Sequence, residues 1–321
     1  MKKLPIILLG VLLFLALFSY NKNTKDKDSL HDKKINEETQ VITLISTGDI
    51  GLVRDVNYKI LQAKNPNYPF LKVAQYLKDA DLTITNLEGP LIDNCPIIRE
   101  GFIFCGEDSN VSGLTYAGID AANLANNHTT NYGLGGLEET AQILNSNGVK
   151  PFGLDKKIEY VQVKNKKVAL VGFVELGNNW AGLNNATPGN VSSLISTAKQ
   201  NSDIVIVSFH WGTEYTYKPT ENQKYLAHLA IDSGADIILG NHPHYLQPME
   251  IYKEKIIVYA QGNTIFDQDW SQETREGVLY KFVWRNNNFE KTQEKFTIIE
   301  GNSQPRFATE EEAIKIKQKI R

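Results

Sequence analysis

The chain has 321 residues, of which 41% are hydrophobic and 22% are charged, as is usual for a globular protein with a sizeable core. Its 37 acidic residues outnumber its 34 Lys and Arg residues, and the formal net charge is −3. The chain therefore has no overall positive field that would attract nucleic acid, and we expect no nucleic-acid partner.

The N-terminus begins with two lysines and a short apolar run. Leu4–Tyr20 carries no charge, and residues 21–40 are highly charged and read as a solvated linker. The run predicts either a cleavable signal peptide or a single membrane anchor, with the following domain outside the cytoplasm. We favour the anchor because Ala16–Tyr20 contains no small-x-small cleavage site. The protein is then bound to the cell membrane, or secreted if residues 1–20 are removed.

From residue 41 onwards, strand and helix patterns alternate, and the C-terminal part is rich in strands. Strands are predicted at 41–45, 82–85, 119–124, 161–163, 167–174, 204–209, 237–239, 247–252, 255–260, 277–284 and 289–299. Helices are predicted at 73–78, 135–145, 192–199, 221–232 and 310–319. This order predicts an α/β fold with helices packed outside two sheets. We expect one domain over 41–300 and a C-terminal tail or helix over 301–321.

The two cysteines, Cys95 and Cys105, lie ten residues apart. Arg99-Glu100-Gly101 between them indicates a turn joining two short strands, so a hairpin would bring the cysteines together. Outside the cytoplasm we expect them to form a disulfide. A reduced structural pair and a zinc site are the alternatives.

Five predicted strands lead into side chains that bind metals or transfer protons. These side chains are Asp49, Asn86 and Glu88, Asn127 and His128, His210, and finally Asn241, His242 and His244. Ligands of α/β folds bind beyond the carboxyl ends of parallel strands, so these residues can share one site. Imidazole and carboxylate together suit a divalent Mn, Zn or Fe ion, and the sequence does not choose among them.

Each of these residues also has an ordinary structural interpretation. His242 and His244 flank Pro243 and can ligate one ion or two adjacent ions, or they can be hydrogen-bonded loop histidines. His210 is a third candidate ligand or a buried structural histidine, and Trp211 beside it can wall the pocket. Asn127 offers a carbonyl ligand, and His128 can protonate a leaving group.

The carboxylates Asp49 and Glu88 complete the predicted site, although a turn or capping role is possible for each. Two nearby cations repel each other, and a bridging oxyanion screens that repulsion. Such a pair of cations generates hydroxide near neutral pH and holds both oxygens of an in-line phosphoryl displacement. One or two bound divalent ions are therefore expected.

Six motifs occur in an order that resembles a known family. They are GDIGLVRD, NLEGPL, LANNHTTNYG, SFHWGTEY, GNHPHYLQPMEIY and AQGNTIFDQ, from about Thr43 to Gln268. The order resembles the bacterial capsule synthesis proteins of the CapA type, which are similar to calcineurin-like metallophosphoesterases. The resemblance implies a four-layer α/β/β/α sandwich with a metal site at the strand ends. It implies Asp49, Glu88, Asn127, His210, His242 and His244 as ligands and His128 as proton donor.

The chain departs from the metallophosphoesterase pattern in two places. Gly51 stands where that pattern has a histidine, and Glu88 replaces the usual bridging aspartate. One metal position is then weak, or another residue such as Asn86 fills it. Arg54 can contact an anionic substrate or lie on the surface. Possible substrate-binding or accessory residues are Arg54, Asn86, Trp211, Glu214 and Asn263.

The resemblance also implies a process, because family members are associated with making or exporting capsular polymers, notably poly-γ-glutamate. We therefore expect a membrane-tethered, metal-dependent hydrolase that cleaves a phosphoester or related bond. Expected partners are synthase subunits and the anionic polymer. The alternative is a non-catalytic polymer-binding or scaffold subunit with a degenerate metal site. An amide-bond hydrolase that releases polymer chains would share the same metal chemistry.

Overall fold

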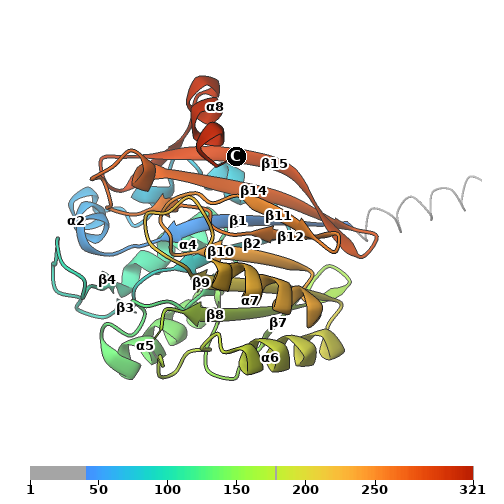
Figure 1. The fold of residues 1–321 in the computed structure, drawn as a ribbon. Coiled ribbons are helices and arrows are strands. Elements are labelled where there is room, and N and C mark those ends of the chain that lie inside the picture. Colours follow the sequence, from blue (N-terminus) through green and yellow to red (C-terminus); the bar gives the residue numbers. More distant parts are fainter. Residues whose placement is uncertain (1–40, 178, 321) are drawn as a thin grey trace, which may run out of the picture. The chain divides into compact units, whose positions relative to one another are not determined.

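A computed structural model describes residues 41–177 and 179–320 of this chain, and it contains two large β-sheets (Figure 1). The larger sheet has the order β16-β15-β14-β1-β2-β5-β6, with β13 also paired to β1. Its parallel part comprises β1 (Ile42–Ile50), β2 (Leu82–Leu87), β5 (Ala121–Asn123), β6 (Lys150–Phe152) and β13 (Asn263–Ile265). Its antiparallel part comprises β14 (Glu276–Arg285), β15 (Asn288–Glu300) and β16 (Gln304–Phe307).

The smaller sheet has the order β11-β12-β10-β9-β8-β7. Its parallel centre comprises β8 (Lys166–Glu175), β9 (Ile204–Trp211), β10 (Ile237–Asn241) and β12 (Lys255–Val258). The antiparallel edges are β7 (Glu159–Val163) and β11 (Met249–Tyr252). A separate parallel pair joins β3 (Leu91–Ile92) to β4 (Gly106–Glu107).

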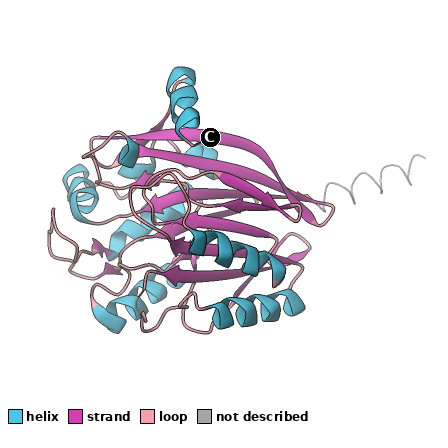
Figure 2. Cartoon of the chain, viewed as in Figure 1, coloured by secondary structure: helices cyan, strands magenta, loops and turns pink. Residues whose placement is uncertain are grey.

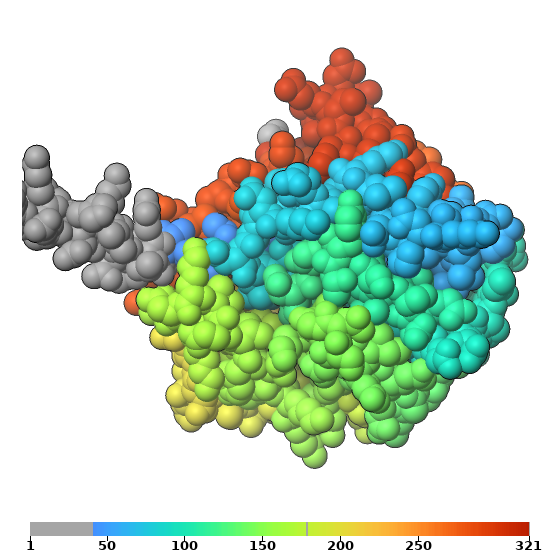
Figure 3. All heavy atoms as spheres, turned by 180° about the vertical axis from the view of Figure 1, so that it is seen from behind, coloured from blue at the N-terminus to red at the C-terminus, as the bar shows by residue number. Residues whose placement is uncertain are grey.

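Seven α-helices lie in the described part of the chain, and Figure 2 shows them around the strands. They are α2 (Arg54–Ala63), α3 (Ala74–Leu77), α4 (Val111–Ala117), α5 (Gly133–Ser146), α6 (Pro188–Asn201), α7 (Glu221–Asp232) and α8 (Glu310–Lys319). Short 3-10 turns are η1 (Tyr68–Phe70), η2 (Asp108–Asn110) and η3 (Glu273–Arg275). Seen from behind, α8 stands out from the rest of the domain (Figure 3).

Alternation along the strands distributes most of the core among three large hydrophobic clusters, and a small fourth cluster surrounds the two cysteines. Leu44 of β1 and Ile206 of β9 belong to a cluster that contains side chains of both sheets. The next residue along each strand points the opposite way, as the period of two requires. Ile45 accordingly packs with residues of α2 to α5, and Val207 packs with residues of α6 and α7.

The mixed α/β fold with two sheets and flanking helices confirms the prediction at that level. Two helices, α2 and α4, lie where the sequence pattern predicted none. The prediction of a hairpin between the cysteines is wrong, because β3 and β4, which flank that segment, pair in parallel. Cys95 and Cys105 are nevertheless joined by a disulfide. No helix among residues 41–177 and 179–320 is long and apolar enough to span a membrane. The predicted anchor lies outside the described residues.

Candidate metal centre

The larger sheet places three polar side chains in one row at its carboxyl edge. Strand pairing sets Asp49 beside Asn86, and Asn86 beside Asn123. Asn86 Nδ2 donates to Asp49 Oδ1 at 2.8 Å, and Asn123 Nδ2 donates to Asn86 Oδ1 at 3.1 Å. Because the amide oxygen of Asn86 is already an acceptor, this side chain supports Asp49 and does not face a cation as a ligand.

Glu88 follows β2 and is fully buried. Neither of its carboxylate oxygens has a hydrogen-bond partner. His244 Nε2 lies 3.7 Å from Glu88 Oε1, and His128 Nε2 lies 3.9 Å from the same atom. An isolated buried carboxylate is very costly, so buried charges are normally paired or bind metals. The surroundings of Glu88 suit a cation.

The smaller sheet supplies His210 from within β9. Val205, Val207, Phe209 and Trp211 point toward α6 and α7, so the alternating residue His210 points toward the larger sheet. Trp211 is therefore a core residue and does not wall the site: it is buried, and its Nε1 donates to Tyr259 O. The predicted pocket role of Trp211 is wrong, because adjacent residues of a strand occupy opposite faces.

The loop after β10 carries His242 and His244 in left-handed backbone conformations. Their φ angles are 95° and 55°, values that residues other than glycine rarely adopt. The backbone N–H of His242 donates to Asp49 Oδ2 at 3.2 Å and so links the two sheets. Strained backbone of this kind is concentrated at functional sites, where the surrounding structure maintains it.

Two potential ligand atoms lie close to His210 Nε2 beside this loop. His210 Nε2 lies 2.9 Å from Asn127 Oδ1 and 3.1 Å from His242 Nδ1. Both spacings are hydrogen-bond distances, which a bound ion would replace with bonds to its ligands. The other ring nitrogen of His210 is buried without a partner.

Two groups of ionisable residues can each hold a metal ion. Ligand atoms of Asp49, Glu88 and His210 all lie within 4.8 Å of one another, and all three residues are buried. The second group comprises Glu214, His242 and His244 at similar spacing, with Glu214 exposed. Asn263 Oδ1 lies 2.9 Å from His244 Nδ1 and fixes the orientation of that ring, as outer-shell partners of metal ligands do.

The pKa values of the histidines in the centre shift in different directions. Burial lowers the pKa of His210 and of His242 well below the usual value, so both rings are neutral and have lone pairs to offer. Burial alone would also lower the pKa of His244, but Glu88 and Asp49 outweigh it and raise that pKa to about 9. Burial raises the pKa of Glu88 to about 8. The metal-free protein therefore keeps a proton on the Glu88–His244 pair.

The space beside Gly51, where the metallophosphoesterase pattern has a histidine, is occupied by another side chain. A Cβ atom at this position would lie 2.7 Å from Cε2 of Phe266. The Phe266 ring thus occupies the space into which a longer side chain would extend. Asn86 does not fill the vacated role, since its amide supports Asp49.

Arg54 is buried at the edge of the centre. It bonds Asp267 through Nε and Nη2, and its Nη1 donates to Gly101 O at 3.0 Å. Arg54, Tyr215 and Trp270 line an open cavity of about 860 Å³, and the Tyr215 ring stacks near His244. With its charge neutralised by Asp267, Arg54 is mainly a structural link between α2 and the loop around Gly101.

Sequence reasoning did not single out Phe104, whose ring stacks on that of His128 at 4.3 Å. It also passed over Asn126, whose Oδ1 accepts from the backbone N–H of His128 and of Thr129. Asn126 had a signal, because it precedes Asn127 at a strand end. Phe104 had none, since it lies in a loop without periodicity.

Comparison with known proteins agrees with this geometry. Residues 43–268 match the family model of the bacterial capsule synthesis protein PGA_cap. The chain belongs to this family. Two Bacillus proteins are similar to this chain: "Capsule biosynthesis protein CapA" of Bacillus anthracis is 33% identical over 273 residues, and "PGA biosynthesis protein CapA" of Bacillus subtilis (strain 168) is 31% identical over 263 residues.

The chain spans about two thirds of the length of these relatives. The alignments cover 78% and 77% of this chain, but 66% of the Bacillus anthracis protein and 69% of the Bacillus subtilis protein. Among solved structures, one described as a novel phosphatase from Mycoplasma pneumoniae matches with a TM-score of 0.53. That match covers 80% of this chain and 94% of the phosphatase at 15% identity, so it shows a phosphatase-like fold.

Proposed function

We propose that this protein is a membrane-tethered, extracytoplasmic, metal-dependent hydrolase that acts in making or exporting a capsular polymer of the poly-γ-glutamate type. The names of the Bacillus relatives support the process, and the apolar run Leu4–Tyr20 supports the location. The expected partners are synthase subunits and the anionic polymer. Hydrolysis of a phosphoester or related bond is the proposed reaction.

One observation carries the catalytic part of the proposal, namely the state of Glu88. Its carboxylate is fully buried, and both oxygens lack a hydrogen-bond partner. Neutral protein dipoles do not satisfy it, whereas Asp49 and His210 offer further ligand atoms within 4.8 Å. A structural carboxylate would be expected to have hydrogen-bond donors around it.

The residues present fit a divalent cation, and they suit two. Asp49, Glu88, Asn127, His210, His242 and His244 would hold the ions. When bound, such ions supply Lewis acidity, which activates water and neutralises charge on a transferring phosphoryl group. The division of the core among three clusters supports the finer α/β/β/α layering that this proposal assumes.

In this mechanism His128 delivers a proton to the leaving oxygen. Burial lowers the pKa of His128 to about 4, so the ring is neutral at pH 7 in the free protein. An anionic substrate beside the ring stabilises the imidazolium and raises that pKa. His128 therefore becomes an acid only when a substrate occupies the site.

The test uses the 321-residue chain, solubilised in detergent and reconstituted with Mn²⁺ or Zn²⁺. We expect one or two equivalents of metal by elemental analysis and metal-dependent hydrolysis of simple phosphodiesters. Glu88→Gln should lose both. Absence of bound metal and of hydrolysis in the wild-type chain would refute the catalytic proposal.

A second function is favoured by the Gly51–Phe266 contact, which blocks the position of the missing histidine. The protein would then be a non-catalytic subunit that binds polymer or supports a synthase. His210→Ala and His242→Ala discriminate between the two functions. Capsule production that survives both substitutions in a folded protein favours the scaffold.

A further inference from the structure

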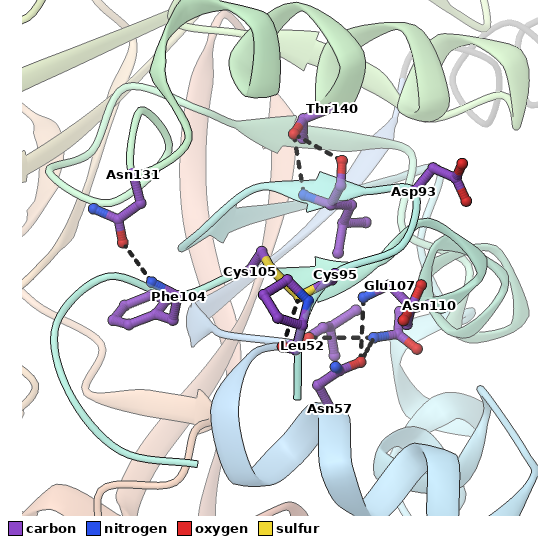
Figure 4. The surroundings of a disulfide bond; sticks show 12 residues. Leu52, Asn57, Asp93, Cys95, Phe104, Cys105, Glu107, Asn110, Asn131 and Thr140 are labelled. Carbon is purple, nitrogen blue, oxygen red and sulfur yellow. Dashed lines mark hydrogen bonds between the residues drawn. A yellow bond between two sulfur atoms is a disulfide. The ribbon is translucent and has the colours of Figure 1, made fainter. Parts of the chain in front are cut away.

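The loop closed by the disulfide lies against the metal centre, although it contributes no ligand. Cys95 and Cys105 close it (Figure 4). Two arginines hold it at further points: Arg54 Nη1 donates to Gly101 O at 3.0 Å, and Arg99 Nε donates to Asp55 Oδ1 at 2.8 Å. The loop is therefore attached at its base and at its tip.

Phe104 is the residue of this loop that reaches the centre. Its side chain is only 1% exposed, whereas Phe102, two residues earlier, is 83% exposed. The Phe104 ring stacks on His128 with centroids 4.3 Å apart and an interplanar angle of 29°. The guanidinium carbon of Arg54 lies 4.7 Å from the centroid of the same ring. Phe104 thus packs between a proposed proton donor and a fixed cation.

A shared acceptor couples the Phe104 backbone to the His128 ring. The backbone N–H of Phe104 donates to Asn131 Oδ1 at 3.1 Å, as drawn in Figure 4. His128 Nδ1 lies 3.3 Å from the same oxygen. Because that oxygen can only accept, Nδ1 of His128 carries the hydrogen. The Nε2 atom is then the one that faces Glu88, at 3.9 Å from Oε1.

We propose that Phe104 is a positioning residue: it fixes the plane of the His128 ring, and the disulfide and Arg54 hold Phe104 in place. The inference rests on the proposed function, in which His128 protonates the leaving oxygen. Stacking restricts rotation of the ring about χ2, and Asn131 selects its tautomer. Together they keep Nε2 directed at the reacting group.

The first experiment measures hydrolysis by metal-loaded Phe104→Leu, which keeps apolar volume but removes the aromatic ring. Two phosphodiesters are compared: diphenyl phosphate, whose leaving group needs a proton, and bis(4-nitrophenyl) phosphate, whose leaving group needs it far less. We expect kcat for diphenyl phosphate to fall by about tenfold to a hundredfold, the usual effect of misplacing a catalytic group, with KM little changed. The loss for the nitrophenyl ester should be much smaller.

Two controls separate positioning from general destabilisation. Phe70→Leu makes the same change at a fully buried phenylalanine in another part of the core, and it should affect both esters equally or not at all. In a His128→Asn background, Phe104→Leu should cause no further loss, because both changes remove the same function. Equal loss on both esters, or additive losses in the double variant, would overturn the proposal.

A second readout does not depend on activity. In the Zn²⁺-loaded protein, the ring current of Phe104 shifts the NMR signals of the His128 ring protons, and Phe104→Leu should remove that shift. If wild type cleaves neither ester but the signals move, the proposed function fails and the positioning role stands. Unmoved His128 signals would overturn the positioning role, whatever the activity.

Discussion

The two candidate ligand groups differ in their access to water. Asp49, Glu88 and His210 are all buried, and Glu88 has no hydrogen-bond donor. Glu214, His242 and His244 include one exposed carboxylate, which is carried by the loop after β9. Ligands held in a buried, prearranged cage lose little freedom on binding, whereas an exposed glutamate must first be ordered. We therefore expect the buried group to bind a cation more strongly than the group that contains Glu214.

Glu88→Gln should have the largest effect, because it removes a buried carboxylate whose oxygens have no hydrogen-bond partner. We expect metal affinity to fall by more than about 100-fold, beyond the usual cost of losing an outer-shell partner. Isothermal titration with Mn²⁺ measures it. Unchanged affinity would mean that Glu88 does not bind metal. Glu290→Gln, which makes the same change at an exposed position, serves as the matched control.

Asn86→Ala tests whether the hydrogen bond from Asn86 positions Asp49 for metal binding. The substitution removes the 2.8 Å hydrogen bond to Asp49 Oδ1 and leaves every proposed ligand in place. Loss of such a partner typically lowers metal affinity by about 10–100-fold. A loss as large as that of Glu88→Gln would instead assign Asn86 itself as a ligand, and no loss would show that Asp49 is held by other contacts.

Glu214→Gln should weaken one position and spare the other. We expect the metal affinity of the weaker position to fall by about tenfold or less, near the lower end of the effects of outer-shell changes. The ion held by the buried group should remain bound, and elemental analysis after dialysis measures how many ions are retained. Equal loss of both ions would show that the two groups form one inseparable cluster.

The smallest predicted effect is a pH dependence of the metal-free protein. The Glu88–His244 pair keeps a proton above pH 7, which the unfolded chain has released by then. The folded state therefore binds more protons, and stability falls as pH rises from 7 to 9. A loss of about 1 kcal/mol lowers the Tm of a chain of this size by roughly 2 °C, because the shift per kcal/mol becomes smaller as the chain becomes longer. Scanning calorimetry in EDTA measures the shift, and Glu88→Gln should flatten it. A Tm that rises over this interval would contradict the assignment.

The strand ends are the part of the molecule that the amino-acid sequence predicts best. Long apolar runs before Asp49 and His210 indicate buried parallel strands, and the polar residue that follows marks the edge where ligands gather. The pairing Asp49–Asn86–Asn123 could not be predicted, because register depends on contacts between segments far apart in the chain. The direction of the Asn86 amide depends on the same contacts.

The loop between the cysteines is the part that local patterns predict worst. A turn-like triplet suggested a hairpin, yet β3 and β4 run parallel. The loop between them packs against α2 through Arg54 and Arg99, contacts that no local pattern indicates. Phe104 shares this difficulty: its burial comes from His128 and Arg54, which are distant in sequence. The predicted pocket role of Trp211 was wrong for a simpler reason: alternation along the strand places its side chain on the face opposite to His210.

The Phe266 ring has a consequence for how such sites diverge. It blocks any side chain at position 51, and it also lies 5.3 Å from both the Arg54 guanidinium carbon and the His244 ring. A lineage that acquired histidine at position 51 would first need a smaller residue at 266, which would loosen both of those contacts. We therefore expect histidine at position 51 to be tolerated only together with a smaller residue at position 266.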